Sequence, residues 1–383
     1  MTKYRFDQIA ENIRVPVMPK PKDSERYIGL EHLDTDSLRI RRWGTEVNLI
    51  GQKLEMKKGD VLFAKRNAYI RRVAVAPFEG LFSAHGMVLR AKTDVCLHEF
   101  LPVFMQSDYF MERAIKISVG SLSPTINWSA LAHEEFELPS LEEQQRIANM
   151  LWAADNHLFE INSLLEGLLR IRKSYIVEKF TQILKGNSKI VPMTQAGDVL
   201  MGRQRSPQYE KGISPRPYLR VANVYDGYVD TTDVKTMDFS DKEYKIFGLK
   251  YGDVLLVEGH SSAEVVGRSL IYKDEVPGSC FQNTLIRFRT KSVSPEFAHQ
   301  YFRHCLYTRE FSRVAKQTTI AHLGSTRFAK MKFPLVAKEI DHEVTKTISE
   351  IESSIAQTQQ QITVNKNLKS QMFSSMLGNN VGD

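Results

Sequence analysis

The stretch LPSLEEQQRI, residues 138–147, marks the start of a helix near the middle of the 383-residue chain. Pro139 ends the preceding segment, and the acidic and amide residues after Leu141 favour the first turn of a helix. From Ile147 onward, apolar residues recur at alternating steps of four and three, which is the heptad pattern of a coiled coil. Gly186 is a suitable C-terminal stop, so the predicted helix is about 65 Å long at about 1.5 Å per residue.

The same pattern recurs near the end of the chain. The seam of the first helix is interrupted by Arg172, and the seam of the second helix is interrupted by Lys369, 197 residues later. The first seam consists of Ile147, Leu151, Leu158, Ile161, Leu165 and Leu168. The second seam consists of Val344, Ile348, Ile351, Ile355 and Ile362. Two copies at a constant offset favour a pair of helices that pack on each other.

The repeat extends through the rest of the chain. EFLPVFMQSDYFMERAIK (99–116) aligns with EFAHQYFRHCLYTREFSR (296–313), and each segment is predicted to be a helix, over about 97–116 and 294–313. MKKGDVLFAKR (56–66) aligns with LKYGDVLLVEG (249–259), where Gly-Asp predicts a turn before a strand. Further strands are predicted in VAVAPF, GMVLRAK, SLIYKD and NTLIRFRT.

The predicted fold class is therefore α+β. Two mostly-β domains with small helices, at 1–138 and 187–335, alternate with two long helices at 139–186 and 336–380. We expect the helices to form an antiparallel coiled coil through a pseudo-two-fold internal repeat, with a domain at each end. Such a pair would act as a ruler between the domains.

Composition indicates a cytoplasmic protein. The net charge of +7 and the pI near 9.1 are compatible with a polyanionic partner. Cys96, Cys280 and Cys305 are too widely spaced for a metal motif and are expected to be reduced thiols. The N-terminus lacks the apolar run of a signal peptide, and no stretch has the length of a membrane span.

Motifs for catalysis are missing. Neither a glycine-rich nucleotide loop nor a Cys/His metal cluster is present, and we predict no catalytic residue, metal ligand or cofactor. Asp253 and Glu258 form part of a nuclease-like array, but His260 stands where such an array has a lysine. The first copy, GDVLFAKRN, has no acidic residue at the position of Glu258. Scattered Ser, His, Asp or Cys residues leave a catalytic set formally open, although no motif surrounds them.

Basic and amide residues in the predicted loops favour DNA binding, because such side chains contact phosphates and base edges. In the first copy the candidates lie in the loop after GDVL and in the loop SVGSLSPTIN: Lys65, Arg66, Asn67, Tyr69, Ser121, Ser123 and Thr125. In the second copy they are Arg203, Arg205, Gly259, His260, Ser261, Ser262, Thr318, Thr319 and His322. The copies diverge most after GDVL, as two readers of different sequences would. Each side chain could equally cap a turn.

The whole chain resembles the DNA-specificity subunit of Type I restriction-modification systems. The resemblance rests on GSLSPTINWSALAHEEFELPSLEEQQRIANMLWAAD (120–155), its weaker copy TTIAHLGSTRFAKMKFPL (318–335), and GRQRSPQYEKGISPRPYLRVANVYDGYV (202–229). It implies a non-catalytic subunit whose two target-recognition domains each read half of a bipartite double-stranded DNA site. The long helices would dock two adenine methyltransferase subunits, and motor-endonuclease subunits would complete the complex. The segment that leads into the second helix is FPLVAKEIDHEV, which lacks the Leu-Pro-x-Leu-Glu-Glu-Gln motif of the family.

Two other interpretations remain open. The chain is also compatible with a specificity module of a related Type IIB-like or phage-defence methyltransferase system. A structural coiled-coil scaffold with two protein-binding domains is the alternative from another class, and steep salt dependence of DNA affinity would distinguish the DNA readers from it.

Overall fold

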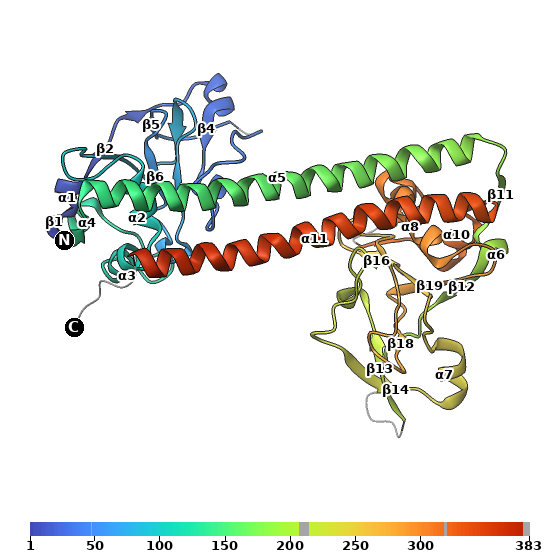
Figure 1. The fold of residues 1–383 in the computed structure, drawn as a ribbon. Helices are drawn as coiled ribbons and strands as arrows, with labels where there is room; N and C mark the ends of the chain where they lie inside the picture. The colour runs from blue at the N-terminus through green and yellow to red at the C-terminus, as the bar shows by residue number, and fades with distance from the viewer. Residues whose placement is uncertain (47, 207–213, 318–319, 378–383) are drawn as a thin grey trace. The chain divides into compact units, whose positions relative to one another are not determined.

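The computed structural model describes residues 1–46, 48–206, 214–317 and 320–377 (Figure 1). Two compact units make up the chain: the first contains Met1–Glu166 and Gln357–Asp383, and the second contains Gly167–Ala356. The long helices α5 (Leu141–Lys185) and α11 (Lys338–Leu377) are present as predicted, and each contributes to both units. The division into four consecutive domains stays a prediction.

The first unit contains two four-stranded sheets. One has the order β2-β9-β6-β7, from β2 (Ala10–Ile13), β9 (Met87–Ala91), β6 (Val61–Phe63) and β7 (Val73–Val75). The other has the order β3-β5-β8-β4, from β3 (Pro16–Val17), β5 (Lys53–Met56), β8 (Gly80–Phe82) and β4 (Tyr27–Ile28). β1 (Thr2–Arg5) pairs antiparallel with β10 (Glu135–Leu138), the strand that leads into α5. The short helices α1 (Phe6–Ile9) and α4 (Trp128–Leu131) lie next to these two strands in the chain.

The second unit repeats this plan. Its main sheet has the order β12-β19-β15-β17, from β12 (Gly197–Met201), β19 (Leu285–Thr290), β15 (Val254–Val257) and β17 (Ser269–Ile271). Two smaller sheets contain β14 (Lys235–Asp238), β13 (Pro215–Leu219) and β18 (Cys280–Phe281), and β16 (Gly259–His260), β21 (Ala321–His322) and β20 (Lys316–Gln317). β11 (Lys189–Pro192) pairs antiparallel with β22 (Lys332–Leu335), as β1 does with β10. Its short helices include α6 (Met193–Ala196), α7 (Asp241–Phe247) and α10 (Ser325–Lys330).

The two Gly-Asp turns confirm the repeat in detail. Gly59 and Gly252 have φ of 92° and 86°, a conformation that favours glycine. The carboxylate of Asp60 accepts a hydrogen bond from the Lys57 backbone N–H at 2.8 Å, and Asp253 accepts from Lys250 at 2.8 Å. Each carboxylate also pairs with an arginine of the neighbouring strand, Arg90 or Arg289. The Gly-Asp of the nuclease-like array is therefore a structural turn.

The single helices predicted over 97–116 and 294–313 are each divided in two. α2 (Phe100–Gln106) is separated from α3 (Asp108–Lys116) by Ser107, which has an extended backbone and caps α3 by accepting from the Phe110 N–H at 3.2 Å. α8 (Pro295–Tyr307) is separated from α9 (Glu310–Val314) near Arg309, whose φ of 62° is left-handed. Apolar periodicity continues across both breaks, so the sequence pattern alone does not reveal them.

Equivalent aromatic clusters form the cores. In the first unit Phe104 and Phe110 pack against Phe136 of β10, with ring centroids 5.3 and 5.5 Å apart. In the second unit Phe288 and Phe302 pack on Phe333 of β22, 197 residues after Phe136. Each buried phenylalanine contributes about 1.5–3 kcal/mol relative to an exposed one.

The long helices are part of both cores. Eight of the eleven predicted seam residues are buried: Ile147, Leu151, Leu158, Ile161, Val344, Ile348, Ile355 and Ile362. Leu165, Leu168 and Ile351 are partly exposed. Ile147 and Leu151 belong to the first unit's core, and Val344 and Ile348 belong to the second unit's core. The start of each seam therefore packs on a globular part as well as along the helix pair.

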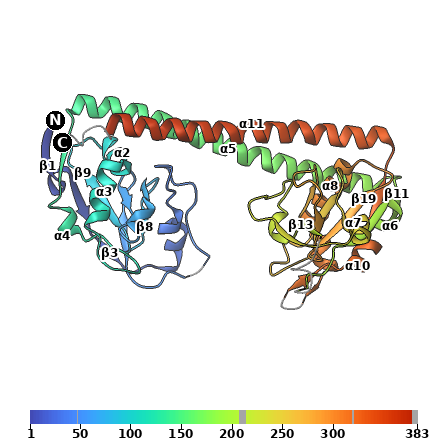
Figure 2. The same cartoon turned by 90° about the horizontal axis from the view of Figure 1, so that it is seen from below.

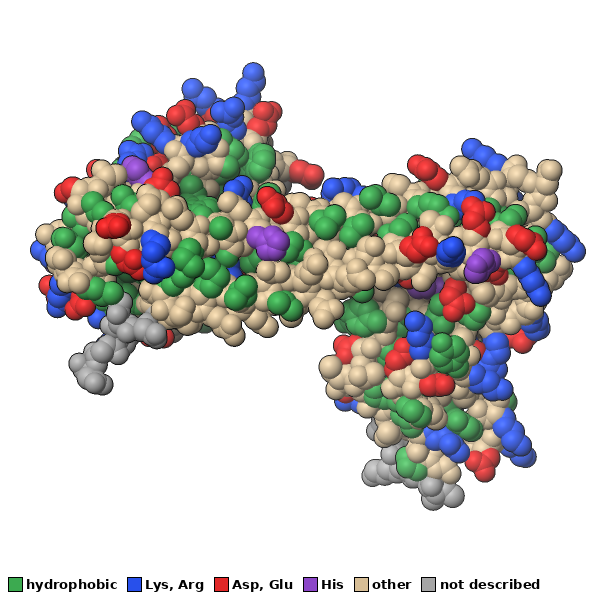
Figure 3. Space-filling model, in the orientation of Figure 1, with side chains coloured by type: hydrophobic (Ala, Val, Ile, Leu, Met, Phe, Trp, Pro, Cys, Tyr) green, Lys and Arg blue, Asp and Glu red, His purple; other side chains and the backbone are tan. Residues whose placement is uncertain are grey.

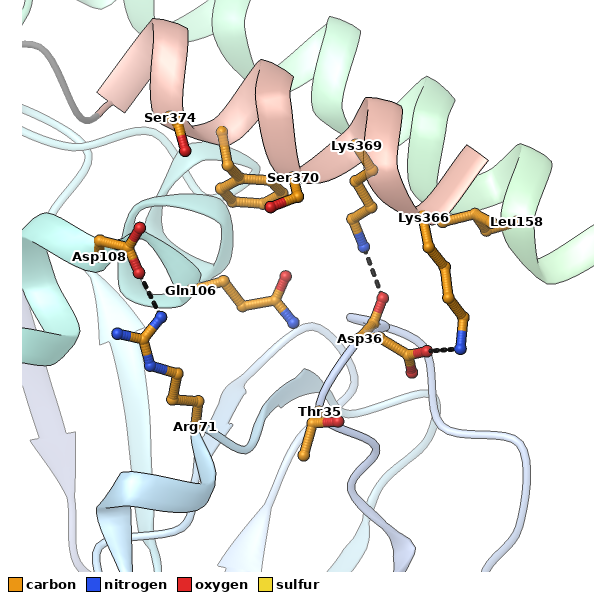
Figure 4. Close-up of a pocket in the computed structure, with 11 residues that line it drawn as sticks. Thr35, Asp36, Arg71, Gln106, Asp108, Leu158, Lys366, Lys369, Ser370 and Ser374 are labelled. Atoms are coloured by element: carbon orange, nitrogen blue, oxygen red, sulfur yellow. Dashed lines mark hydrogen bonds and ion pairs between the residues drawn. The ribbon is translucent and has the colours of Figure 1, made fainter. Parts of the chain in front are cut away.

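Within each unit the α5 and α11 segments lie side by side and antiparallel (Figures 1 and 2). Basic residues that interrupt the seams connect the pair to the globular part. In the first unit Lys369 lies 2.5 Å from Asp155 and also donates to the Asp36 backbone carbonyl at 2.8 Å, as Figure 4 shows in part. In the second unit Arg172, the counterpart of Lys369, lies 3.8 Å from Glu352, the counterpart of Asp155.

None of the helices in the described residues combines the length and apolar character that a membrane span needs.

Candidate nucleic-acid interface

In the first unit, two loops that are far apart in the sequence come together. Arg66 forms a β-bridge with Thr125, and the Asn67 backbone N–H donates to the Pro124 carbonyl at 2.7 Å. The Arg66 guanidinium donates to the Ser123 hydroxyl at 3.2 Å. The predicted loop after GDVL and the predicted loop 118–127 therefore form one surface, which we call the first loop surface.

Backbone geometry presents this surface to solvent. Asn67 and Arg71 have φ of 54° and 59° on either side of a short 3-10 turn, Ala68–Ile70. Asparagine tolerates this left-handed conformation better than most residues. The turn leaves the Tyr69 side chain 57% exposed, and Arg66 and Ser121 are also exposed. An exposed aromatic ring beside an arginine and several hydroxyl groups is suited to contacts with both bases and phosphates.

The corresponding loops of the second unit also meet. β16 and β21 pair antiparallel, so Gly259 lies opposite His322 and His260 lies opposite Ala321. Ser261 and Ser262 follow and are exposed. The His260 Nδ1 accepts a hydrogen bond from the Ser262 backbone N–H at 3.0 Å. We call these residues the second loop surface; the predicted Thr318 and Thr319 lie outside the described residues.

Glu258 closes the base of the second loop surface. Its side chain is buried and accepts hydrogen bonds from His322 at 3.0 Å and from the Gly324 backbone N–H at 3.1 Å. The carboxylate of Glu258, the acid of the nuclease-like array, thus has its hydrogen-bond partners within the protein. Across the described residues, no group of three or more His, Cys, Asp or Glu side chains is placed to hold a metal ion.

Arg203 and Arg205 have different surroundings. The Arg203 side chain is buried, lies 3.1 Å from Glu243 and packs over the ring of Phe239, with 4.8 Å between guanidinium carbon and centroid. These contacts attach the end of β12 to α7. Arg205 is exposed and belongs to the segment before the undescribed residues 207–213. The placement of Arg203 indicates a structural role, and its contact with DNA stays a prediction.

Further cations lie beyond the predicted set. Figure 3 shows Lys and Arg side chains gathered on the part of the first unit that contains β4 and β5, and along one edge of the second unit. Arg14 and Lys53, which sequence analysis did not select, lie beside Lys65 in a cleft of the first unit. Arg14 follows the end of a strand and has no motif around it, so only its alignment with the second copy would have drawn attention to it.

Comparisons with known proteins agree with this architecture. A family model described as the Type I restriction modification DNA specificity domain matches residues 45–166 and 203–365. The specificity subunit of the Type I restriction enzyme EcoKI from Escherichia coli K12 is 25% identical over 280 residues. This alignment covers 67% of the chain but only 59% of the relative's length.

Solved structures share the fold. A chain from a study of complex assembly and conformational transition of the type I R-M system has a TM-score of 0.60 at 16% identity. That match covers 98% of this chain and 97% of the other. The S subunit of a Type I restriction-modification system from M. genitalium has a TM-score of 0.58 at 14% identity, covering 98% and 95%.

Proposed function

Because the chain belongs to the family of Type I restriction modification DNA specificity domains, we propose that it is the DNA-reading subunit of a Type I restriction-modification complex. Each loop surface would read one half of a bipartite site in double-stranded DNA. The observation that supports this most directly is the equivalence of the two surfaces. Both join the loop after a GDVL strand to the loop before a long helix, yet their side chains differ.

We further propose that catalysis belongs to partner subunits. Two adenine methyltransferase subunits would dock on the long helices, and motor-endonuclease subunits would complete the complex. Apolar grooves that share counterpart residues support two copies of one partner: the first unit has a groove between α5 and α11, along Met150, His157, Leu368 and Met372. The second unit has a groove along Gly167, Ile171 and Tyr175, in which Ile171 and Tyr175 are the counterparts of Leu368 and Met372.

Spacing between the half-sites would follow from the helices. α5 and α11 each contribute to both units and pair within each of them, so the fixed length of the helices would act as a ruler. The proposed segments are a first target-recognition domain at 1–138, a second at 187–335, and spacer helices at 139–186 and 336–380.

The experiment begins with the natural site. Mapping methylated adenines in the host genome identifies the bipartite sequence, and gel shifts then compare the reassembled complex on that duplex and on a scrambled one. We expect Arg66→Ala to weaken specific binding by about 5- to 150-fold, because a good base contact is worth about 1–3 kcal/mol. Base substitutions in one half-site should then no longer matter at the position that Arg66 reads.

Two further variants complete this experiment. His260→Ala should reduce discrimination between bases in the other half-site. Lys3→Ala removes an exposed cation paired with Glu135 and should leave discrimination in both half-sites unchanged. Equal affinity of the wild-type complex for the mapped and scrambled duplexes would contradict the proposal.

A further inference from the structure

A cleft of about 340 Å³ opens beside the first loop surface. Its walls come from the end of β2, from the start of β5, from Lys65 and from residues 126–128. Three cations, Arg14, Lys53 and Lys65, and the side-chain amides of Asn12, Gln52 and Asn127 line it, so positive charge and amide groups converge on one space. The backbone fixes part of this arrangement, since the Ile126 N–H donates to the Lys65 carbonyl at 3.0 Å.

Positive charge in the cleft is uncompensated. None of the residues that line it is acidic, and within the described residues neither the Arg14 nor the Lys65 side chain has a hydrogen bond or an ion pair. Lys53, a third cation, donates to the backbone carbonyls of Ile50 and Gly51 instead. Burial, and then the charge of Arg14, lowers the pKa of the Lys65 ammonium, as expected where cations lack an anion.

In the second unit, the positions equivalent to Asn12, Arg14 and Lys65 carry neither cations nor amides. Strand pairing equates Ala10, opposite Ala91, with Gly197, opposite Thr290, so Asn12 corresponds to Val199 and Arg14 to Met201. The GDVL alignment equates Lys65 with Glu258, whose carboxylate is satisfied internally by His322 and Gly324. Asn12, Arg14 and Lys65 of the first cleft thus correspond to two apolar residues and one acidic residue in the second unit.

We propose that this cleft binds a backbone phosphate of the DNA, and that the counterparts of Asn12, Arg14 and Lys65 in the second unit do not form such a site. The inference rests on the proposed DNA-reading function and adds a sequence-independent anchor to it. Arg14 and Lys65 would neutralise the phosphate, and the Asn12 and Asn127 amides would donate hydrogen bonds to its oxygens. Because a phosphate contact releases counterions but reads no base, it contributes affinity and salt dependence rather than specificity.

The test uses the reassembled complex with Arg14→Gln and Lys65→Gln combined. Affinity for the mapped duplex is measured at several salt concentrations, alongside duplexes altered in each half-site. We expect the slope of log affinity against log salt to become shallower by about one, and affinity at 0.1 M salt to fall about tenfold. The ratios of affinity between mapped and altered duplexes should not change.

Two further variants separate charge from structure. Arg14→Lys with Lys65→Arg keeps both charges and should retain the wild-type slope. Lys3→Gln with Arg146→Gln removes two exposed cations of the same unit, each paired with a neighbouring glutamate, and should also retain it. Thermal unfolding of every variant shows whether a loss of affinity reflects misfolding. If the Arg14→Gln, Lys65→Gln variant is misfolded, the salt slope of the Arg14→Lys, Lys65→Arg variant tests the proposal, and a slope shallower than wild type contradicts it.

The outcomes are distinct. An unchanged slope in the Arg14→Gln, Lys65→Gln complex overturns the phosphate site, while the wild type's discrimination still supports the proposed function. A change confined to duplexes altered in one half-site overturns it in favour of a base contact. Saturable binding of inorganic phosphate to the wild type, lost in the variant and not in competition with DNA, assigns the cleft to free phosphate instead. Failure of the wild type to discriminate any duplex overturns the proposed function itself.

Discussion

Asp226 connects the helix pair of the second unit to its globular part. Its carboxylate lies 2.7 Å from Arg303 of α8 and 3.2 Å from Arg172 of α5, and Arg303 also pairs with Glu352 of α11. The Arg303 side chain is almost completely buried, so these two carboxylates compensate for the cost of burying its charge. Although burial alone would raise it, the pKa of Asp226 is held below its ordinary value by Arg303, with smaller contributions from His299 and Arg172.

This lowered pKa predicts a pH-dependent contribution to stability. A carboxyl group with a depressed folded pKa stabilises the fold above its unfolded pKa, and the contribution is lost as the pH falls through the folded value. We expect Asp226→Asn to destabilise the second unit by about 1–3 kcal/mol at pH 7, because Arg303 loses a charged partner. The difference from wild type should begin to shrink below about pH 4, where the unfolded-state carboxyl becomes protonated, and should be lost as the pH falls through the lower folded-state pKa of Asp226.

Urea unfolding from pH 2.5 to 7 tests this, with circular dichroism reporting both units. All three tryptophans, Trp43, Trp128 and Trp152, belong to the first unit, so their fluorescence should show an unaltered transition. Asp241→Asn, at an exposed carboxylate of the second unit, is the matched control. A pH-independent difference between Asp226→Asn and wild type would contradict the assignment.

At the scale of elements, α5 and α11 leave equivalent apolar side chains in solvent. Ile171 is 55% exposed and Leu368 is 51% exposed, 197 residues apart in the repeat. Neither is needed for the described cores, and each lies in one of the grooves proposed to receive a methyltransferase subunit. Contiguous apolar patches rimmed by polar residues, and not single apolar side chains, are typical of binding surfaces, so the grooves around these two residues support the proposal.

Changing these residues should therefore alter assembly and not folding. We expect Ile171→Ser and Leu368→Ser each to change the free energy of unfolding by no more than about 0.5 kcal/mol. Each single variant should bind one methyltransferase subunit in place of two, and the double variant none, as counted by native mass spectrometry. Leu164→Ser, at another exposed apolar position of α5, is the control and should bind two. Two bound subunits on the double variant would show that docking occurs elsewhere.

How far the elements could be predicted depends on whether their signals are local. Heptad spacing and the Gly-Asp turns depend on neighbouring residues, so the long helices, the main strands and the repeat were recognised from the sequence. Contacts over long separations were not: Lys369 meets Asp155 across 214 positions, and Arg203 is buried by Glu243 and Phe239. Sequence analysis identified Lys369 as an interruption of the seam and Arg203 as a candidate DNA contact, and it predicted neither partner, because the partners are defined only by the tertiary fold.

The candidate site shows the same limit. Loop composition identified Lys65, Arg66 and their neighbours, and the structure brings this loop against the loop of Ser123 and Thr125. Arg14 was missed because it lies at a strand end, where one arginine is unremarkable. Its significance appears only when strand register equates it with Met201.

At the scale of the whole molecule, the first unit is assembled from both ends of the chain. Leu377 belongs to its buried core, and Met372, Phe373 and Met376 of α11 pack against that core. The second unit includes the remaining part of each long helix. A change in the length of one helix alone therefore shifts its register against the other helix, whereas equal changes in both preserve the pairing within each unit.

Equal insertions test the proposed ruler. Seven residues added after Glu166 in α5 and seven after Ala356 in α11, at the boundary between the units, maintain the heptad phase. Each helix lengthens by about 10.5 Å. Since DNA rises about 3.4 Å per base pair, the methylated site should keep both half-sites and gain about three base pairs between them. Adenine methylation mapping in cells that express the variant measures the spacing directly. The single insertion in α5 should abolish methylation, and an unchanged spacer with both insertions would show that the helices do not set the distance.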